Sequence, residues 1–305
     1  MSLLKIIDRV DNFTYDTLPS NLYLLKTHDD QNIIGYITES VAQELIKFPE
    51  FITLQNGKEL KINSNLDSRE KRNSIVNKVA QSLKQLNKFE TLKGWRDELY
   101  TVYYPSKVEY FQAERAFCPL LGLIMYGVHI NGYIPKELSS DGQLKFWVQR
   151  RSKTKATFPG LLDNTIAGGL GYPHGIYETA IKESYEEAGI NKEYIIENLT
   201  QSGVVSYIYQ NDQEGGLIQP EIEYIFDLKF DETTIPTPID NEAEEFVLMT
   251  VDEIKIQLLN GEFKPNSGLV IVDFLIRHGL IKFEDDENYT DIVLRSHRPP
   301  PFPTK

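Results

Sequence analysis

Short apolar runs separated by turn residues predict two hairpins in the first third of the chain. The runs at 22–26 and 33–37 flank a polar six-residue segment and predict the first hairpin. The runs at 51–54 and 60–62 flank Asn56-Gly57, a dipeptide typical of tight hairpin turns. The alternation in this region therefore favours a small sheet.

Helical spacing of apolar residues predicts three helices around these strands. The first is a short helix within 1–12, and the second covers 38–48 with Thr38 or Ser40 as N-cap. The third covers 67–86 with Asp67 as N-cap, and its apolar stripe consists of Ile75, Val79, Leu83 and Leu86. Residues 1–115 are thus expected to form a small α+β domain. The domain carries no chemical motif, and a substrate lid, core support and a dimer contact all remain open as its role.

From Phe117 onward the pattern changes to longer apolar strands followed by amphipathic helices. A turn is expected at Gly132, and the polar, glycine-rich loop at 211–216 is predicted to be mobile. Strands are predicted at 121–130, 145–151, 204–209 and 223–228, and closing helices at 252–260 and 267–279. These elements predict a second domain over 116–292. Residues 293–305 end in PPPFPTK and are expected to form an extended tail.

Composition and charge exclude several classes of protein. Of the 305 residues, 41% are hydrophobic and 25% charged, which is typical of a globular protein with an ample core. The net charge is −13 and no long basic stretch is present, which argues against nucleic acid as a partner. No apolar run reaches the length of a membrane span, and the N-terminal residues do not resemble a targeting segment. The single cysteine, Cys118, lies in an apolar run and is expected to be a buried small hydrophobe. One cysteine permits no intramolecular disulfide, so nothing indicates an oxidising compartment, and the cytoplasm is the expected one.

The segment 167–190 carries the most informative chemistry in the chain. In a helix over 176–188, Glu183, Glu186 and Glu187 lie at i, i+3 and i+4, which places three carboxylates on one face. A solvated acidic face is the alternative interpretation. The preceding Gly168-Gly169 permits close approach of a ligand to the backbone, however, and oxygen ligands on a helix suit Mg²⁺ or Mn²⁺.

This segment resembles the Nudix box, in which a glycine loop precedes a helix with the pattern R-E-U-x-E-E-x-G-U. Gly168 corresponds to the first glycine, and Glu183, Glu186 and Glu187 correspond to the three metal-binding acids. The first glutamate, the arginine and the aliphatic of the pattern are replaced by His174, Lys182 and Ser184. An i,i+4 pair between Glu178 and Lys182 would replace the missing brace of the helix. With this brace, a His174→Glu substitution is expected to be tolerated.

The resemblance implies an α/β/α Nudix sandwich with a mixed sheet, and an Mg²⁺-dependent diphosphatase. It extends to a fungal and plant branch in which the Nudix domain stands alone or precedes a thiamine pyrophosphokinase. The matching segments are Phe146–Ser152, Thr154-Lys155, Phe158–Gly160, Leu162–Asn164, Lys264–Asn266 and Phe274–Gly279. Members of that branch are associated with hydrolysis of oxidised, damaged thiamine diphosphate to the monophosphate, a form of metabolite repair. The expected partner is therefore a small-molecule diphosphate, and the oligomeric state is open.

The resemblance also implies roles for individual side chains. Glu183 and Glu187 would be the principal metal ligands, with the Gly168 carbonyl as an additional ligand. Glu186 would be a ligand or would order a water molecule. A further carboxylate, Glu242 or Glu244, is a candidate helper, although a solvated acidic loop is the alternative for both.

Substrate contacts are expected from the strand at 145–151. Arg150 and Arg151 point to opposite faces of this strand, so one of them can face the cleft and bind a phosphate. These arginines belong to a cationic segment with Lys153 and Lys155. Trp147 can stack on a flat ring or pack in the core. The scattered histidines are expected to be structural, namely His129, His278 and His297.

Two other functional classes remain open from sequence. The altered positions His174, Lys182 and Ser184 favour a non-catalytic Nudix module that binds a nucleotide or a protein, since fold does not imply activity. Hydrolysis of another nucleoside diphosphate derivative is the second alternative. An isomerase or transferase on the same fold is a minor one. Retention of all three acids favours a hydrolase.

Overall fold

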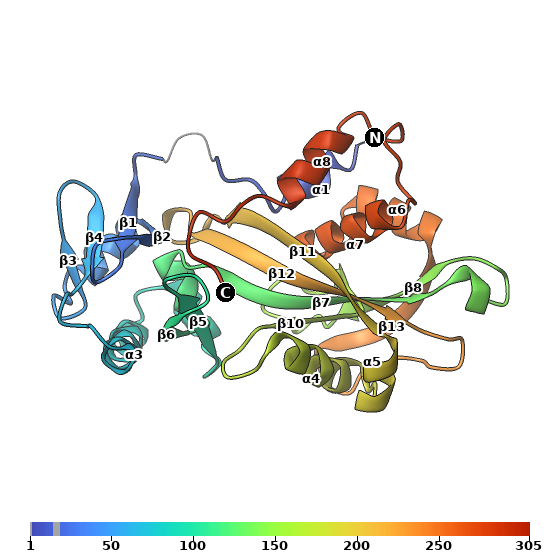
Figure 1. The fold of residues 1–305 in the computed structure, drawn as a ribbon, viewed down its shortest axis with the longest axis horizontal. Coiled ribbons are helices and arrows are strands. Elements are labelled where there is room, and N and C mark those ends of the chain that lie inside the picture. The colour runs from blue at the N-terminus through green and yellow to red at the C-terminus, as the bar shows by residue number, and fades with distance from the viewer. Residues whose placement is uncertain (1, 15–18) are drawn as a thin grey trace.

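The computed structural model describes residues 2–14 and 19–305 and shows an N-terminal unit beside a larger unit built on a long mixed sheet (Figure 1). The N-terminal sheet has the strand order β2-β1-β4-β3. Its strands are β1 (Leu22–Lys26), β2 (Ile33–Thr38), β3 (Ile52–Leu54) and β4 (Glu59–Ile62). Both predicted hairpins are confirmed, because β1 pairs antiparallel with β2 and β3 pairs antiparallel with β4.

Helices α2 (Glu39–Leu45) and α3 (Arg69–Gln85) accompany this sheet. The predicted N-cap of α3 is wrong, because the side chain of Ser68, not Asp67, accepts a hydrogen bond from the backbone N–H of Lys71. Leu86 follows the last residue of α3 and is 58% exposed, so the apolar stripe ends at Leu83.

A hairpin that was not predicted completes the N-terminal unit. It consists of β5 (Leu99–Tyr103) and β6 (Glu109–Glu114), preceded by a 3₁₀ helix, Glu90–Gly94. Buried residues from Tyr23 to Leu123 form one core, and Leu217 from the larger unit is part of it. The predicted domain boundary at residue 115 remains a prediction.

The loop at 211–216, predicted to be mobile, is instead docked on the N-terminal unit. The carbonyl oxygen of Glu214 accepts hydrogen bonds from the hydroxyls of Thr38 at 3.0 Å and Ser40 at 2.7 Å. Its carboxylate accepts from the backbone N–H of Glu90 at 2.7 Å. Insertion of the neighbouring Leu217 into the N-terminal core explains why a polar loop is held in place.

The larger unit is built on a seven-stranded mixed sheet with the main order β11-β12-β7-β8-β13, in which β12 and β7 are parallel. Two short strands lie off this path, since β10 pairs with β7 and β9 pairs with β8. The strands are β7 (Met125–Ile134), β8 (Lys145–Arg151), β9 (Leu162–Asp163), β10 (Ile166–Gly169), β11 (Leu199–Gln210), β12 (Ile218–Lys229) and β13 (Ala243–Thr250).

Helices cover both faces of this sheet, as the α/β/α sandwich predicts (Figure 1). One face packs against α4 (Ile176–Ala188) and α5 (Lys192–Asn198). The other packs against α6 (Val251–Asn260) and α7 (Pro265–Arg277), with α1 (Leu4–Asp8) and α8 (Tyr289–Ser296) alongside. Across the described parts of the chain, no helix combines the length and the apolarity needed to cross a membrane.

Two predictions about the first strand of this unit are wrong. The strand begins at Met125 rather than 121, because Cys118–Leu121 forms a 3₁₀ helix that ends at Gly122 with a φ of 61°. Gly132 lies inside β7 and begins no turn. A Cβ atom there would lie 2.7 Å from both Phe230 and Thr165, so the glycine serves close packing within the strand.

The tail differs from the predicted free, extended segment. Helix α8 continues to Ser296, so the extended part starts four residues later than expected. Phe302 is then buried edge-on against Tyr36 of the N-terminal unit, with ring centroids 4.7 Å apart. The backbone N–H of Lys305 donates to the hydroxyl of Tyr126 at 3.0 Å. The tail therefore contacts both units of the protein.

Candidate functional site

The acidic helix α4 follows β10 as the sequence predicts. It starts after Gly175, whose backbone N–H donates to the Glu178 carboxylate at 3.3 Å. It ends at Gly189, which has a φ of 66° in the left-handed region that suits a glycine after a helix. These ends fix the helix beside the glycine strand Ile166–Gly169.

Glu183 and Glu187 point from α4 toward β10. A Cβ atom on Gly168 would lie 2.4 Å from the side chain of Glu183, so only glycine permits this approach. Glu187 is buried, and its Oε2 accepts hydrogen bonds from the backbone N–H of Ala167 at 3.1 Å and from Gln149 at 3.4 Å. The structure therefore brings together Gly168, Glu183 and Glu187.

Burial is the main reason why both carboxyls are weaker acids than usual. It raises the pKa of Glu183, and it raises the pKa of Glu187 well above the usual range, where the charge of Glu183 adds to it. Lys182 offsets part of this effect at Glu183, whereas Glu187 is buried beside a second carboxyl.

Glu186 lies on the outer side of the helix and is half exposed. Lys182 Nζ pairs with Glu186 at 2.6 Å and with Glu183 at 3.1 Å. Burial alone would lower the pKa of Lys182, but these two carboxylates raise it to about 12. The predicted brace between Glu178 and Lys182 is wrong, because Glu178 pairs with His174 at 3.3 Å on the preceding turn. A glutamate at position 174 would consequently face Glu178 and repel it.

The donor set fits a divalent cation of the Mg²⁺ type. Within residues 2–14 and 19–305, no three His, Cys, Asp or Glu side chains gather in a metal-binding cluster. The candidate donors are instead two carboxylates, Glu183 and Glu187, and the backbone carbonyl of Gly168. All three are oxygen donors, and Mg²⁺ is commonly bound by one or two carboxylates with water and phosphate as remaining ligands.

Replacing Lys182 by alanine tests whether this lysine compensates the acidic face. In metal-free protein we expect a loss of about 0.5 kcal/mol in unfolding free energy, because the pair is partly exposed and screened. Saturating Mg²⁺ should reduce that loss by neutralising the same carboxylates. Urea unfolding with and without Mg²⁺ measures both values, with Lys192→Ala on exposed α5 as control. An equal loss in both conditions would contradict the expectation.

The cationic segment at 150–155 is paired with protein carboxylates. Arg150 pairs with Glu245 at 3.2 Å, and Lys153 lies 3.8 Å from Glu244. Lys155 forms an ion pair with Glu242. Glu242 and Glu244, at the start of β13, thus contact lysines of this segment. A role for either glutamate as a helper carboxylate remains a prediction.

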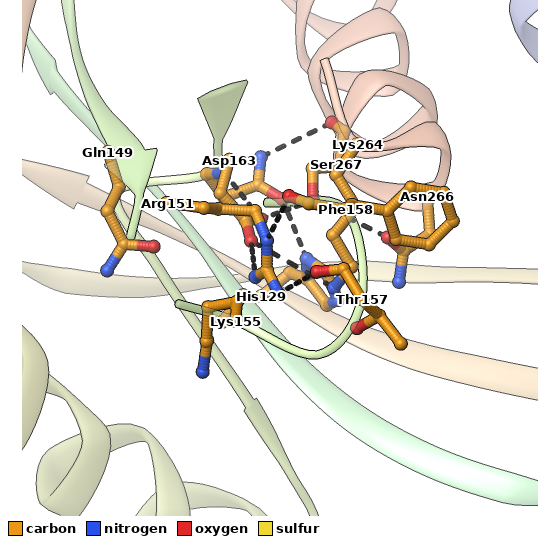
Figure 2. A network of polar contacts seen from close by, with 12 residues as sticks. His129, Gln149, Arg151, Lys155, Thr157, Phe158, Asp163, Lys264, Asn266 and Ser267 are labelled. Carbon is orange, nitrogen blue, oxygen red and sulfur yellow. Dashed lines mark hydrogen bonds and ion pairs between the residues drawn. The ribbon is translucent and has the colours of Figure 1, made fainter. Parts of the chain in front are cut away.

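Arg151 is held in the interior by a network around Asp163 (Figure 2). Its Nη1 donates to Asp163 Oδ2 at 2.6 Å, and its other nitrogens donate to the carbonyls of Phe158 at 3.1 Å and Thr157 at 2.9 Å. Asp163 also accepts from the Ser267 hydroxyl. Burial alone would raise the pKa of Asp163, but the charges of Lys264 and Arg151 lower it to about 2.

The remaining predicted substrate contact, Trp147, packs against protein. Trp147 is partly buried against the apolar core under α4 and α5. Contact of substrate with Trp147, Arg150 or Arg151 therefore stays a prediction. Of the histidines, His278 pairs with Asp227 at 3.1 Å and His297 lies 3.5 Å from Asp273, whereas His129 faces a cavity.

A cavity of about 350 Å³ opens between the two units and reaches Gly168 and Gly169. This volume suits a small organic ligand. The N-terminal unit lines one wall, and the larger unit lines the other with β7, β10, β11, β12 and the start of α7. The Tyr100 hydroxyl lies against Gly169, where a Cβ atom would clash with it at 1.6 Å.

Cations from distant parts of the chain line this cavity. They are Arg9, Arg96, Arg115 and Lys264. Arg115 Nη1 donates to Glu98 at 3.0 Å, and its guanidinium lies 5.5 Å from the centre of the Tyr100 ring. The sequence analysis did not single out Arg9, Arg96, Arg115 or Tyr100, because isolated cations and aromatics in a domain without a motif give no local signal.

The comparisons with known proteins agree with this geometry. Residues 138–268 match the NUDIX domain family, and residues 16–125 match a domain of unknown function, DUF4743. The chain is 42% identical to uncharacterized protein YJR142W of Saccharomyces cerevisiae, over 99% of this chain and 92% of that protein. It is 36% identical to Nudix hydrolase 24, chloroplastic, of Arabidopsis thaliana, over 87% of this chain and 70% of that protein. The chain belongs to the Nudix hydrolase family.

Nudix hydrolase 20, chloroplastic, of the same plant is 35% identical over 87% of this chain and 71% of that protein. Both plant relatives therefore align with the N-terminal unit as well as with the Nudix domain. In this Nudix hydrolase, the two matched regions meet at the cavity beside Gly168. The N-terminal unit is thus part of the candidate site.

Proposed function

We propose that this Nudix hydrolase is an Mg²⁺-dependent diphosphatase that acts on oxidised derivatives of thiamine diphosphate. Water would attack the terminal phosphorus, the bridging P–O bond would break, and the products would be phosphate and the monophosphate. The observation that carries the proposal is the cavity that joins Gly168, beside Glu183, to cationic and aromatic side chains of both units. The resemblance of Phe146–Ser152 and neighbouring segments to the thiamine-related branch supports the choice of substrate.

In this proposal, Glu183, Glu187 and the Gly168 carbonyl hold the metal. When bound, Mg²⁺ supplies Lewis-acid polarisation of the phosphate and lowers the pKa of a coordinated water. Ala167 and Gln149 orient the Glu187 carboxylate through their hydrogen bonds to its Oε2.

Binding of the anionic diphosphate needs local positive charge, because the whole protein has a net charge of −13. Arg96 and Arg115 supply it from the N-terminal wall, and Arg115 lies beside the ring of Tyr100, whose hydroxyl is against Gly169. Lys264 supplies it from the opposite wall. Flat aromatic surfaces in the same cavity, including Tyr126 and Tyr209, suit a heteroaromatic substrate.

A panel of diphosphates tests the proposal. Thiamine diphosphate, its oxidised forms, NADH, ADP-ribose and nucleoside diphosphates are incubated with the protein and Mg²⁺, and released phosphate and monophosphate are measured. We expect kcat/KM to be highest for an oxidised thiamine diphosphate. A preference of about tenfold or more for NADH or ADP-ribose over every thiamine derivative, roughly 1.4 kcal/mol, would refute the substrate assignment.

Replacing Arg96 by glutamine tests the N-terminal wall. Arg96 is exposed at the cavity, so the change should leave the fold intact and raise KM for the best substrate by about tenfold, with little change in kcat. Steady-state kinetics and a thermal melt provide the measurements. Arg69→Gln, at a surface ion pair with Glu109, is the matched control. If both variants behaved alike, the wall would play no part in substrate binding.

A further inference from the structure

A buried tyrosine of the N-terminal unit points its hydroxyl at the glycine strand of the larger unit. Tyr100 lies on β5 and is 4% exposed. It lines the cavity, and a Cβ atom on Gly169 would lie 1.6 Å from its hydroxyl oxygen. This hydroxyl makes no hydrogen bond to any residue in the described parts of the chain. Tyr100 therefore combines burial, a place in the cavity wall and an unused hydrogen-bonding group.

The two other buried tyrosines of the cavity wall have hydrogen-bond partners in the protein. The hydroxyl of Tyr207 donates to the carboxylate of Glu223 at 3.0 Å. The hydroxyl of Tyr126 accepts from the backbone N–H of Lys305 at 3.0 Å. A buried polar group without a partner is costly, and a ligand that supplies the partner removes this cost. The unused hydroxyl of Tyr100 therefore points to a ligand.

The segment 98–100 is held against the loop between β10 and α4. The backbone N–H of Tyr172 donates to the carbonyl of Leu99 at 2.7 Å. A Cβ atom on Gly171 would lie 2.9 Å from the carboxylate of Glu98. These contacts directly precede the tyrosine, so its ring enters the cavity from a backbone that is already fixed. A donor held in this way needs little reorganisation when a ligand binds.

Two consecutive glycines connect this hydroxyl with the candidate metal site. Side chains alternate along a strand, so Gly168 makes room for Glu183 on one face of β10 and Gly169 makes room for Tyr100 on the other. No side chain of β10 separates the two at these positions. The candidate metal site and the hydroxyl therefore lie on either side of the same short stretch of glycine backbone.

The protonation state of Tyr100 suits a hydrogen-bond donor. Burial raises the pKa of its phenol, although the nearby guanidinium of Arg115 acts in the opposite direction. The phenol therefore keeps its proton at neutral pH. The oxygens of a diphosphate carry negative charge and are strong hydrogen-bond acceptors, so the O–H can donate to them.

We propose that the Tyr100 hydroxyl donates a hydrogen bond to the diphosphate of the substrate, so that the N-terminal unit contributes a catalytic residue to the Nudix site. This inference rests on the proposed function as far as diphosphate hydrolysis is concerned, and it is independent of the ring that carries the diphosphate. As the bridging P–O bond breaks, negative charge grows on the leaving phosphate, and the hydrogen bond becomes stronger. Tyr100 keeps its proton throughout.

Replacing Tyr100 by phenylalanine removes the hydroxyl and keeps the ring. In the full-length protein with saturating Mg²⁺, we expect kcat/KM for the best substrate of the panel to fall by about 30-fold or more, chiefly through kcat. The melting temperature should stay at or above the wild-type value, because the hydroxyl has no partner within the described residues. Tyr103→Phe, on the same strand, is the matched control. Its hydroxyl accepts from Lys305 Nζ at 3.0 Å, so this variant should keep the wild-type kcat/KM.

A second substrate separates a contact with the diphosphate from a contact with the ring. Thiamine diphosphate and one of its oxidised forms share the diphosphate and differ in the ring, so Tyr100→Phe should reduce kcat/KM for both by the same factor, within about threefold. A loss confined to one ring would overturn the inference. Wild-type kcat/KM in the folded variant would also overturn it, and so would a loss of activity accompanied by a lower melting temperature.

The outcomes also separate this inference from the proposed function. If the panel identifies a substrate outside the thiamine derivatives and Tyr100→Phe shows the expected loss with it, the substrate assignment fails and the role of Tyr100 is supported. If an oxidised thiamine diphosphate is the best substrate and Tyr100→Phe matches the wild type, only the role of Tyr100 is refuted. If the wild type hydrolyses no diphosphate, both proposals fail.

Discussion

Replacing Glu187 by glutamine is expected to reduce phosphate release by about 100-fold or more at saturating Mg²⁺ and substrate. The amide preserves the shape of the side chain and can accept the hydrogen bond from Ala167, but it loses the negative charge that a metal ligand requires. Stopped-time assays of released phosphate measure the effect. Glu197→Gln, on the exposed side of α5, is the control and should retain wild-type activity.

The same substitution should not destabilise metal-free protein. Burial and the charge of Glu183 raise the pKa of Glu187, so the unfolded chain ionises this carboxyl at a lower pH than the folded chain does. Its ionisation therefore favours unfolding as the pH rises above about 4.3, the unfolded value. Without Mg²⁺, Glu187→Gln should gain stability relative to the wild type from pH 4 to pH 7. Urea unfolding at both pH values measures this difference.

Two results would contradict the assignment of Glu187. Turnover at the wild-type rate would show that the metal ligands lie elsewhere. A variant that is inactive but also strongly destabilised at neutral pH would show that the ionised carboxylate supports the fold.

Replacing Asp163 by asparagine is expected to lower the unfolding free energy by about 3 kcal/mol at pH 7. Asp163 is fully buried between Arg151, Ser267 and the backbone N–H of Asn164. Removal of one partner leaves the guanidinium of Arg151 buried without its counter-charge, which is costly in protein interiors. Asp212→Asn, on the exposed loop before β12, is the control and should change stability by less than about 0.5 kcal/mol.

The pH dependence of this loss follows from the lowered pKa. The carboxyl titrates at about 2 in the folded protein and at about 3.9 in the unfolded chain. Its stabilisation is therefore present above pH 4 and is lost as the pH falls toward 2, with a size of about 2.5 kcal/mol. The difference in stability between the wild type and Asp163→Asn should narrow between pH 7 and pH 3. If the variant instead matched the wild type in stability and raised KM, Arg151 would belong to the substrate site.

The sequence alone determined the local elements that carry the candidate metal-binding acids. The spacing of Glu183 and Glu187 sets them on one helix face whatever the rest of the fold, since helical geometry depends only on positions along the chain. Gly168 before this helix and Gly189 after it were also recognised from their positions in the sequence. Asn56-Gly57 likewise placed a turn between β3 and β4.

Sequence reasoning failed where a charged side chain finds its partner outside its own helix or strand. Alternation on β8 correctly placed Arg150 and Arg151 on opposite faces, but the partners of Arg151 include Asp163, which Ser267 also contacts from 104 residues away. Glu221 and Glu223 had a local signal, since carboxylates two positions apart on an apolar strand share one face. Their contacts with Tyr207 on β11 and His129 on β7 come from other strands, so no local pattern indicates them.

The candidate site as a whole was decided by tertiary structure. The sequence determined that a glycine loop precedes an acidic helix, because both features are short-range and follow from backbone geometry. Only the packing of the N-terminal unit against the sheet placed Tyr100 against Gly169 and brought Arg96 and Arg115 into one cavity with Gly168. These contacts join segments more than 50 residues apart, and the burial of apolar surface between them, rather than any local propensity, fixes their positions.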